Sequence, residues 1–180
     1  NMMVGRPVQL VIDKTQAHPG EEILHVEDLC VLSHLHKRNA VDHVSFSVRA
    51  GEIVCIAGID GNGQTELIHG LTGLDKITGG SVTLCGETIT HASIRRRGKN
   101  MSHIPEDRHK HGLVLDFTLE QNMVLQRYKE PQFQHGGFIR RDAVRAYADR
   151  LIEQFDVRSG QGAVTIARSM SGGNQQKAII

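Results

Sequence analysis

The sequence has almost no excess of positive or negative charge and no long apolar run, and each absence excludes a class of function. Its formal net charge is +1, with 23% charged residues, so it shows neither the basic excess of a nucleic-acid-binding domain nor an acidic tail. The longest apolar run, residues 53–57, is far shorter than a membrane span. The N-terminus lacks a signal-peptide pattern, so we expect a soluble chain that is not exported.

Cysteine is scarce as well, and the three cysteines are widely spaced in apolar surroundings: Cys30, Cys55 and Cys85. An odd number at such spacing argues against disulfides and cysteine zinc sites, and fits a reducing compartment. Histidines occur in pairs, His34 with His36 and His109 with His111. Because neither pair has a Cys, Asp or Glu at zinc-ligand spacing, we predict no histidine metal site from the sequence.

The most informative stretch extends from residue 51 to residue 74. Its apolar run, residues 53–57, predicts a strand buried on both faces, and a glycine-rich loop follows directly. After Gly63 the apolar residues take helical spacing, so the unit is strand, glycine loop and helix. Such a loop brings several backbone N–H groups to a phosphate, with the positive end of the helix dipole behind them. We therefore predict a phosphate-binding loop over residues 58–65.

This loop matches G-x-x-x-x-G-K-[ST] at every position except Gln64, which replaces the lysine. An amide donates a hydrogen bond but brings no positive charge to the β- and γ-phosphates. A charge-assisted hydrogen bond contributes about 1.5–3 kcal/mol against about 1 kcal/mol for a neutral one, so we expect about tenfold weaker nucleotide binding. The loss in phosphoryl transfer is expected to be on the order of a hundredfold or more. Thr65 keeps the hydroxyl that would bind Mg²⁺.

Secondary structure elsewhere can be predicted from the spacing of apolar residues. Alternation predicts antiparallel strands over residues 23–31 and 44–48, and a hairpin over residues 77–90. The arginines at residues 95–97 are interpreted as a solvated helix end without a function. A short strand is expected at residues 101–104, stopped by Pro105 and followed by a charged loop of the kind that meets ligands.

Two helices are expected in the last third of the chain. Asp142 is expected to cap one that continues to about Phe155, with Tyr147 in its apolar stripe, and residues 119–128 would pack beside it. Ser171, followed by two glycines, is expected to cap the other helix and to create a second anion site at its start.

Four segments, in this order, resemble the nucleotide-binding domain of ATP-binding cassette (ABC) transporters: HVEDLCV, AVDHVSFSVRAGEIVCIAGIDGNGQTELIHGLTGL, PEDRHKHGLVLDFTLEQNMVL and SGGNQQK. The last two are especially similar to the double-domain ATPases of simple-sugar and nucleoside importers. The resemblance implies an α/β fold: a P-loop NTPase (RecA-like) core, an antiparallel β subdomain and a small helical subdomain. We expect a linker or the tail of a preceding domain at 1–22, the β subdomain and core at about 23–117, the helical subdomain at about 118–170 and the signature motif at 170–177.

The same resemblance implies ATP and Mg²⁺ as cofactors and assigns their ligands. The phosphates would be bound by the loop and the first helical turn: Gly58, Asp60, Gly61, Asn62, Gly63, Gln64, Thr65 and Glu66. Mg²⁺ would be bound by Thr65 and by Glu106, which takes the position of the Q-loop glutamine. The signature acts on the nucleotide of a partner domain, through Ser171, Gly172, Gly173 and Gln175. The aromatic residue that stacks on adenine in this family is replaced by Leu35 and His36.

The resemblance implies the ATP-binding part of an importer for simple sugars or nucleosides, and the lysine-less loop favours the second, degenerate domain of a tandem protein. Its partners would be a second nucleotide-binding domain, membrane permease subunits and a solute-binding protein, with no nucleic acid. It would lie in the cytoplasm, at the inner face of the membrane.

The chain ends before the family's Asp-Glu strand and switch histidine, so we expect a C-terminally truncated domain that does not hydrolyse ATP alone and self-associates through exposed apolar surface. One alternative is a non-catalytic nucleotide-binding or regulatory module. Another is a soluble ABC ATPase of translation or DNA repair, whose basic surface is not evident at a charge of +1.

Overall fold

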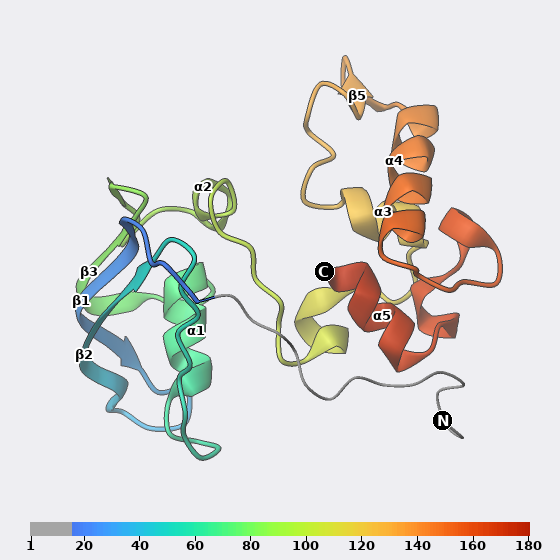
Figure 1. The fold of residues 1–180 in the computed structure, drawn as a ribbon. Coiled ribbons are helices and arrows are strands. Elements are labelled where there is room, and N and C mark those ends of the chain that lie inside the picture. The colour runs from blue at the N-terminus through green and yellow to red at the C-terminus, as the bar shows by residue number, and fades with distance from the viewer. Residues whose placement is uncertain (1–15) are drawn as a thin grey trace. The chain divides into compact units, whose positions relative to one another are not determined.

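The computed structural model describes residues 16–180, which form two compact units (Figure 1). The first unit ends at Ser102, and the second extends from His103 to Ile180. The predicted helical subdomain, at about 118–170, falls within the second unit. Most of the predicted linker, residues 1–22, lies outside the described residues.

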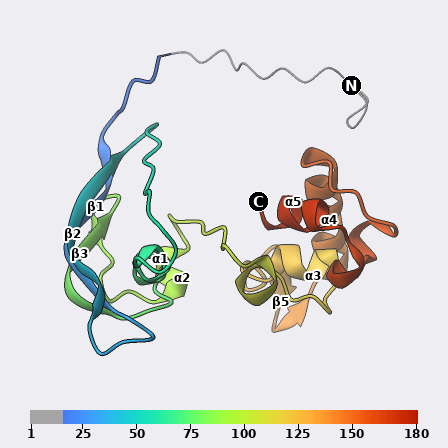
Figure 2. The same cartoon turned by 90° about the horizontal axis from the view of Figure 1, so that it is seen from below.

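An antiparallel sheet forms the framework of the first unit. Its strands are β1 (Glu22–Leu32), β2 (Asn39–Arg49), β3 (Ile77–Leu84) and the short β4 (Glu87–Thr88), in the order β2-β1-β3-β4. The predicted antiparallel strands and hairpin are therefore confirmed. Helices α1 (Gln64–Thr72) and α2 (Ile94–Arg97) both lie on the concave side of this sheet (Figure 2).

A bulge in β1 decides which of its residues face the core. Asp28 has a positive φ of 53°, and the register of β1 shifts between Val26 and Leu29 toward β2 and between Glu27 and Cys30 toward β3. The extra residue resets the alternation, so Val26 and Leu29 are both buried. Gly80 lies opposite with φ 80°, and a Cβ there would come within 2.3 Å of the carbonyl oxygens of Glu27 and Asp28. Only glycine fits this position.

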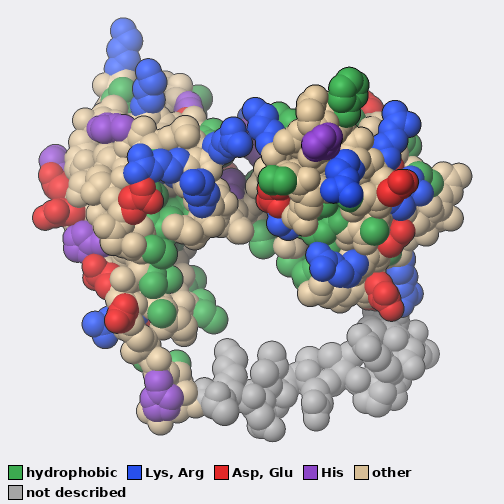
Figure 3. All heavy atoms as spheres, turned by 90° about the horizontal axis from the view of Figure 1, so that it is seen from above, with side chains coloured by type: hydrophobic (Ala, Val, Ile, Leu, Met, Phe, Trp, Pro, Cys, Tyr) green, Lys and Arg blue, Asp and Glu red, His purple; other side chains and the backbone are tan. Residues whose placement is uncertain are grey.

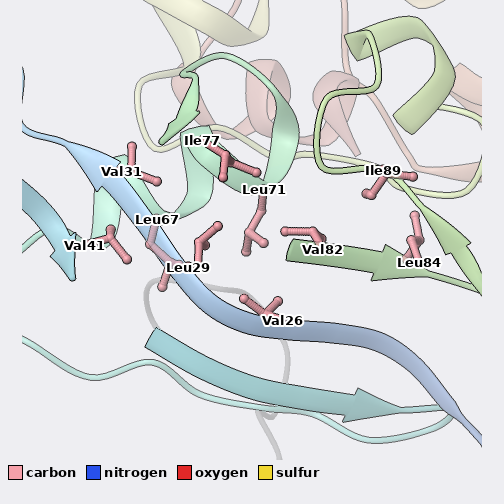
Figure 4. Close-up of a cluster of buried hydrophobic side chains, with 10 residues drawn as sticks. All are labelled: Val26, Leu29, Val31, Val41, Leu67, Leu71, Ile77, Val82, Leu84 and Ile89. Carbon is pink, nitrogen blue, oxygen red and sulfur yellow. The ribbon is translucent and has the colours of Figure 1, made fainter. Parts of the chain in front are cut away.

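The core of the first unit lies between the sheet and α1 (Figure 4). Helix α1 contributes Leu67 and Leu71, which meet buried side chains from three strands and from the segment after β4: Val26, Leu29, Val31, Val41, Ile77, Val82, Leu84 and Ile89. A Cβ on Gly70 would lie 2.8 Å from the Val31 side chain, so the helix approaches the sheet closely at that glycine. Burial of this cluster positions the helix that follows the glycine loop.

The prediction of a buried strand before the loop was wrong. No strand forms over residues 53–57 of the described chain; Ile53 is 94% exposed and Ile56 is 45% exposed. A central parallel strand must pair with neighbours on both sides, and residues 16–180 contribute only antiparallel pairs. The described chain supplies no parallel strand to pair with this apolar run.

Two further expectations for this part of the chain were also wrong. No strand forms over residues 101–104, because the described chain contains no strand that pairs with them. Pro105, which follows directly, has no N–H group to donate to a neighbouring strand. Arg97 was expected to be solvated but is 3% exposed. It is buried because its guanidinium donates to backbone carbonyls of Gly70, Leu71, Thr90 and Ala92, and this burial lowers the pKa of Arg97.

The second unit is built from short helices, and a small cluster of buried side chains forms at Val124, Phe133 and Val144. A π-helical turn (Arg108–Gly112) is followed by α3 (Leu119–Val124), the hairpin strands β5 (Gln134–His135) and β6 (Phe138–Ile139), and α4 (Arg141–Gln154). Two 3₁₀ turns (Gly162–Val164 and Ala167–Ser169) lead to α5 (Gly172–Ile179). The ring of Tyr147 lies 5.0 Å from that of Phe133, so its predicted place in the core is confirmed.

The start of α4 differs from the prediction by two residues. The capping position is Arg140, and Asp142 lies inside the first turn. The Arg140 N–H group donates to the carbonyl of Phe133 at 2.8 Å, which closes the β5–β6 hairpin and fixes where the chain enters the helix. Asp142 still interacts favourably with the positive end of the helix dipole.

The surface of the described residues carries mixed charge. On the face shown in Figure 3, Lys and Arg side chains occur in small groups among acidic, histidine and apolar side chains. Within residues 16–180, none of the helices combines the length and the apolar character that crossing a membrane requires.

Candidate nucleotide-binding site

The glycine loop leads directly into α1, as the sequence predicted. Gly61 and Gly63 have positive φ values of 84° and 95°, and Gly63 is the residue immediately before the helix. A Cβ on Gly63 would lie 2.4 Å from the carbonyl oxygen of Ala40, so a side chain has no room there. The Asn62 N–H donates to the Ile59 carbonyl at 3.2 Å and tightens the turn. The loop therefore wraps around the positive end of a nine-residue helix.

Gln64, the residue in the lysine position, folds back over the loop. A Cβ on Gly58 would come within 1.8 Å of the Gln64 amide group. In the amide orientation that satisfies both partners, Gln64 donates to the Ile59 carbonyl at 3.2 Å and accepts from the Gly58 N–H at 3.3 Å. The side chain thus engages the Gly58 N–H group and the Ile59 carbonyl within the loop. Contact with a phosphate would require the amide to leave both partners, which weakens binding beyond the missing charge.

The remaining loop residues fit a phosphate group and, in part, a magnesium ion. Thr65 and Glu66 lie in the first turn of α1, where the backbone N–H groups have no acceptor within the helix. The Thr65 side chain supplies an oxygen of the kind that Mg²⁺ prefers. Asp60 and Gly61 are exposed at the tip of the loop. Leu35 is exposed in the loop between β1 and β2, and His36, beside it, is exposed as well.

The signature segment begins α5 in the second unit. Ser171 occupies the capping position, as predicted, but its hydroxyl oxygen accepts from the Asn174 side chain at 3.0 Å rather than from the helix backbone. Asn174 in turn accepts from the Arg158 N–H at 2.9 Å. A Cβ on Gly173 would meet nothing within 4 Å, so the surface above that residue is open.

An arginine that the sequence reasoning missed lies beside this helix start. A Cβ on Gly172 would be 2.9 Å from a terminal nitrogen of Arg108. Arg108 therefore brings a positive charge to the point where the helix dipole already favours an anion. Arg108 directly follows Glu106 and Asp107 in the charged loop that the sequence predicts to meet ligands, and this position could have identified it as a candidate.

Gln175 is buried and hydrogen-bonded within the protein, so its side chain is not placed to contact a ligand directly. It is 4% exposed, and its amide nitrogen donates to the Ala167 carbonyl at 2.9 Å. Its oxygen accepts from Arg108 at 3.3 Å and from His109 at 3.0 Å. Gln175 therefore connects α5 to the π-helical turn and orients Arg108.

Glu106 lies on the exposed loop before that turn. Its neighbour Asp107 caps the turn, accepting from the backbone N–H groups of His109 at 2.9 Å and Lys110 at 3.1 Å. These hydrogen bonds from Lys110 and His109 lower the pKa of Asp107. The loop that bears Glu106 is thus held at its C-terminal end.

The sequence profile of the family described as "ABC transporter" matches residues 41–180. The chain belongs to this family. The matched range contains the glycine loop, the Glu106 loop and the signature, so the three segments described above come from one ABC domain sequence.

Several curated ABC proteins resemble the chain along its whole length. The nucleoside import ATP-binding protein NupA of Lactococcus lactis is 44% identical over 99% of this chain and 35% of its own length. The guanosine import ATP-binding protein NupO of Bacillus subtilis is 44% identical over 100% and 35%. The glucose import ATP-binding protein TsgD13 of Haloferax volcanii is 37% identical over 99% and 33%. The chain spans about a third of the length of these relatives.

A solved structure of an ATP-binding subunit of an ABC transporter shares the fold. It aligns with 87% of this chain and 59% of its own length, with a TM-score of 0.64 and 21% identity. The predicted α/β P-loop NTPase fold, with its antiparallel sheet and helical part, is thereby confirmed.

Proposed function

We propose that this chain is part of the ATP-binding protein of an ABC importer, and that its glycine loop is a weakened phosphate site. The observation that carries the proposal is the loop itself: two glycines at positive φ lead into a helix start. ATP with Mg²⁺ is the ligand that this family uses, with the phosphates at residues 58–66 and Mg²⁺ at Thr65. Gln64 makes this copy the weaker of two sites.

The second half of the proposal concerns the signature. Ser171, Gly172 and Gly173 would contact the γ-phosphate of a nucleotide bound by a partner domain. Arg108 supports this role because its guanidinium lies at the same helix start, where it adds a charge that the loop of the first unit lacks. Gln175 would contribute by holding Arg108 in place.

The names of the relatives support a proposal for the transported molecule and the partners. The two relatives at 44% identity are named for nucleoside and guanosine import, and the relative named for glucose is 37% identical. We favour a nucleoside cargo on this basis. A second ATP-binding domain, membrane permease subunits and a solute-binding protein would be the partners, and the chain would work at the cytoplasmic face of the membrane.

The proposal can be tested by calorimetric titration of the folded chain with ATP and with AMP, each with Mg²⁺ at matched ionic strength. A phosphate cradle binds the triphosphate at least tenfold more tightly than the monophosphate, and chelation of Mg²⁺ weakens that binding. Equal affinities for ATP and AMP would contradict the proposal, as would a folded chain that binds neither at millimolar concentration.

The alternative hypothesis is that the chain is a non-catalytic interaction module. The Gln64 side chain favours this hypothesis because it folds back over the loop. Under that reading the loop keeps its shape without a ligand. Absence of nucleotide binding together with unchanged folding supports the rival, so the same titration separates the two.

A further inference from the structure

Three potential metal ligands from separate segments of the first unit meet near the end of α1. They are His34 in the loop between β1 and β2, His69 in the last turn of α1, and Asp75 in the connection from α1 to β3. The His34 Nε2 atom lies 2.7 Å from Asp75 Oδ2, and His69 Nδ1 lies 3.3 Å from the same oxygen. One ligand atom from each residue lies within 4.8 Å of the other two.

The fold itself holds two of these ligands together. The carbonyl of His69 accepts from the N–H groups of Gly73, Leu74 and Asp75, at 2.9, 2.9 and 3.1 Å. Gly73, with φ 85°, turns the chain back on the helix end. The Asp75 carboxylate is thereby brought beside the His69 ring, and the two side chains are only 16% and 19% exposed.

The third ligand is positioned by a turn in the loop. The Ser33 hydroxyl oxygen accepts from the N–H groups of Leu35 and His36 at 3.2 and 3.3 Å, and the Ser33 N–H donates to the Arg38 carbonyl at 2.9 Å. These bonds place His34 so that its ring meets that of His69 edge-on, with centroids 6.3 Å apart. Its side chain is 58% exposed, so an ion has access from solvent.

We propose that His34, His69 and Asp75 form a binding site for a divalent transition-metal ion such as Zn²⁺. Two imidazole nitrogens and one carboxylate oxygen are a ligand set that Zn²⁺ and Co²⁺ accept, with the remaining positions filled by water. Ligand atoms about 2.0–2.2 Å from one tetrahedral ion lie about 3.3 Å apart. The His69–Asp75 distance already has this value, and the His34–Asp75 distance of 2.7 Å must lengthen for both ligand atoms to bind one ion. The proposal does not depend on nucleotide binding.

The spacing of these three residues in the sequence could not have predicted that they form one cluster. His34 is 35 residues before His69 and 41 before Asp75, whereas its neighbour His36 is not among these ligands. A bound ion would connect the loop before β2 to the C-terminal end of α1. The competing description is a hydrogen-bonded cluster without an ion, in which both imidazoles donate to the one carboxylate oxygen.

The experiment is titration of the chelator-treated chain with Zn²⁺ by calorimetry, repeated with Co²⁺ by visible absorption. His34→Gln and Asp75→Asn are the test variants, because His34 is exposed and Asn keeps the shape of Asp. His36→Gln is the matched control from the same loop, and His43→Gln controls for the other group of potential ligands in this unit, Cys30, Asp42 and His43. Thermal unfolding with and without Zn²⁺ shows whether each variant folds.

We expect one equivalent to bind at micromolar concentration or tighter and to raise the unfolding temperature. Affinity should fall at least tenfold in His34→Gln and in Asp75→Asn, with the Zn²⁺-dependent temperature shift lost, and should be unchanged in both controls. Binding that survives in the folded test variants would overturn the proposal, because other histidines would then hold the ion. Absence of binding below millimolar Zn²⁺ would overturn it as well and leave the hydrogen-bonded cluster.

Discussion

Arg97 donates a 2.7 Å hydrogen bond from its guanidinium to the carbonyl of Leu71, in the last turn of α1. The same side chain donates to the carbonyls of Thr90 at 2.8 Å and Ala92 at 3.0 Å. The last carbonyls of a helix have no N–H partner within it, so Arg97 satisfies groups that burial would otherwise leave unpaired. The arginine thus closes the end of the helix whose start forms the glycine loop.

Replacing Arg97 with Met is therefore expected to destabilise the first unit by about 2–4 kcal/mol, since several buried carbonyls lose their donor. Arg95→Met is the matched control, because Arg95 is exposed in the same helix, and it should change stability by less than about 0.5 kcal/mol. Urea unfolding of both variants measures the difference. Equal stability of the two would show that Arg97 is solvated, as its sequence context suggested.

The buried amide of Gln175 gives the second prediction. Gln175→Leu removes an acceptor of Arg108 and His109 and the donor to Ala167, and should cost about 1–3 kcal/mol. Gln176→Leu, at the exposed neighbouring position, should cost less than about 0.5 kcal/mol. Hydrogen exchange of the α5 amides should be faster in Gln175→Leu alone. If both variants behave alike, the amide network does not hold the signature helix.

The pair of His43 and Asp28 gives a prediction about pH. The hydrogen bond from His43 Nδ1 to Asp28 at 2.7 Å, the negative charge of Asp28 and that of Asp42 raise the pKa of His43. A pKa raised on folding means that protonation favours the folded state. This contribution to the stability of the folded state is complete at pH values below the pKa of the unfolded state, about 6.5. It is lost as the pH rises through the pKa of His43 in the folded state.

Asp28→Asn isolates this effect, since Asn also tolerates the positive φ of the bulge. Titration of His43 by NMR should show a pKa above 6.5 in the native chain and a lower value in the variant. The stability difference between the two chains should be larger at pH 5.5 than at pH 8. An identical His43 titration in both chains would refute the pairing.

Exposure of the segment before the glycine loop leads to the fourth prediction. Because Ile53 is 94% exposed, Ile53→Ser should change the free energy of unfolding by less than about 0.5 kcal/mol, whereas a buried isoleucine would lose several kcal/mol. The exposed apolar residues of this segment and of the loop that follows it, Ile53, Val54, Ile56 and Ile59, also favour self-association. Ile53→Ser should reduce the association seen by sedimentation velocity. A native chain that stays monomeric at high concentration would contradict this.

The sequence predicted the elements that depend on local pattern. Alternation identified β1 and β2, and the change to helical spacing after Gly63 identified α1, because each element buries one face within the same unit. The glycine loop could be recognised for a similar reason: its function depends on backbone conformation, which Gly61 and Gly63 determine locally.

Features that depend on distant partners could not be predicted. Residues 53–57 have strand composition, but strand formation requires neighbours that the described chain does not supply. Arg97 resembles a surface residue until the end of α1 is placed beside it. His34 and Asp75 are far apart in sequence, and only the turn after α1 brings them together. In each case tertiary contacts override the local pattern.

The central claim is that the glycine loop is a phosphate cradle weakened at Gln64, and a charge series at that position tests it most directly. ATP with Mg²⁺ would be titrated into the native chain, Gln64→Lys, Gln64→Glu and Gln126→Lys, the last adding the same charge at an exposed site in the other unit. The account predicts about tenfold tighter binding in Gln64→Lys, weaker binding in Gln64→Glu and native affinity in Gln126→Lys. Equal affinity in all four chains, or an equal gain from both lysines, would contradict it.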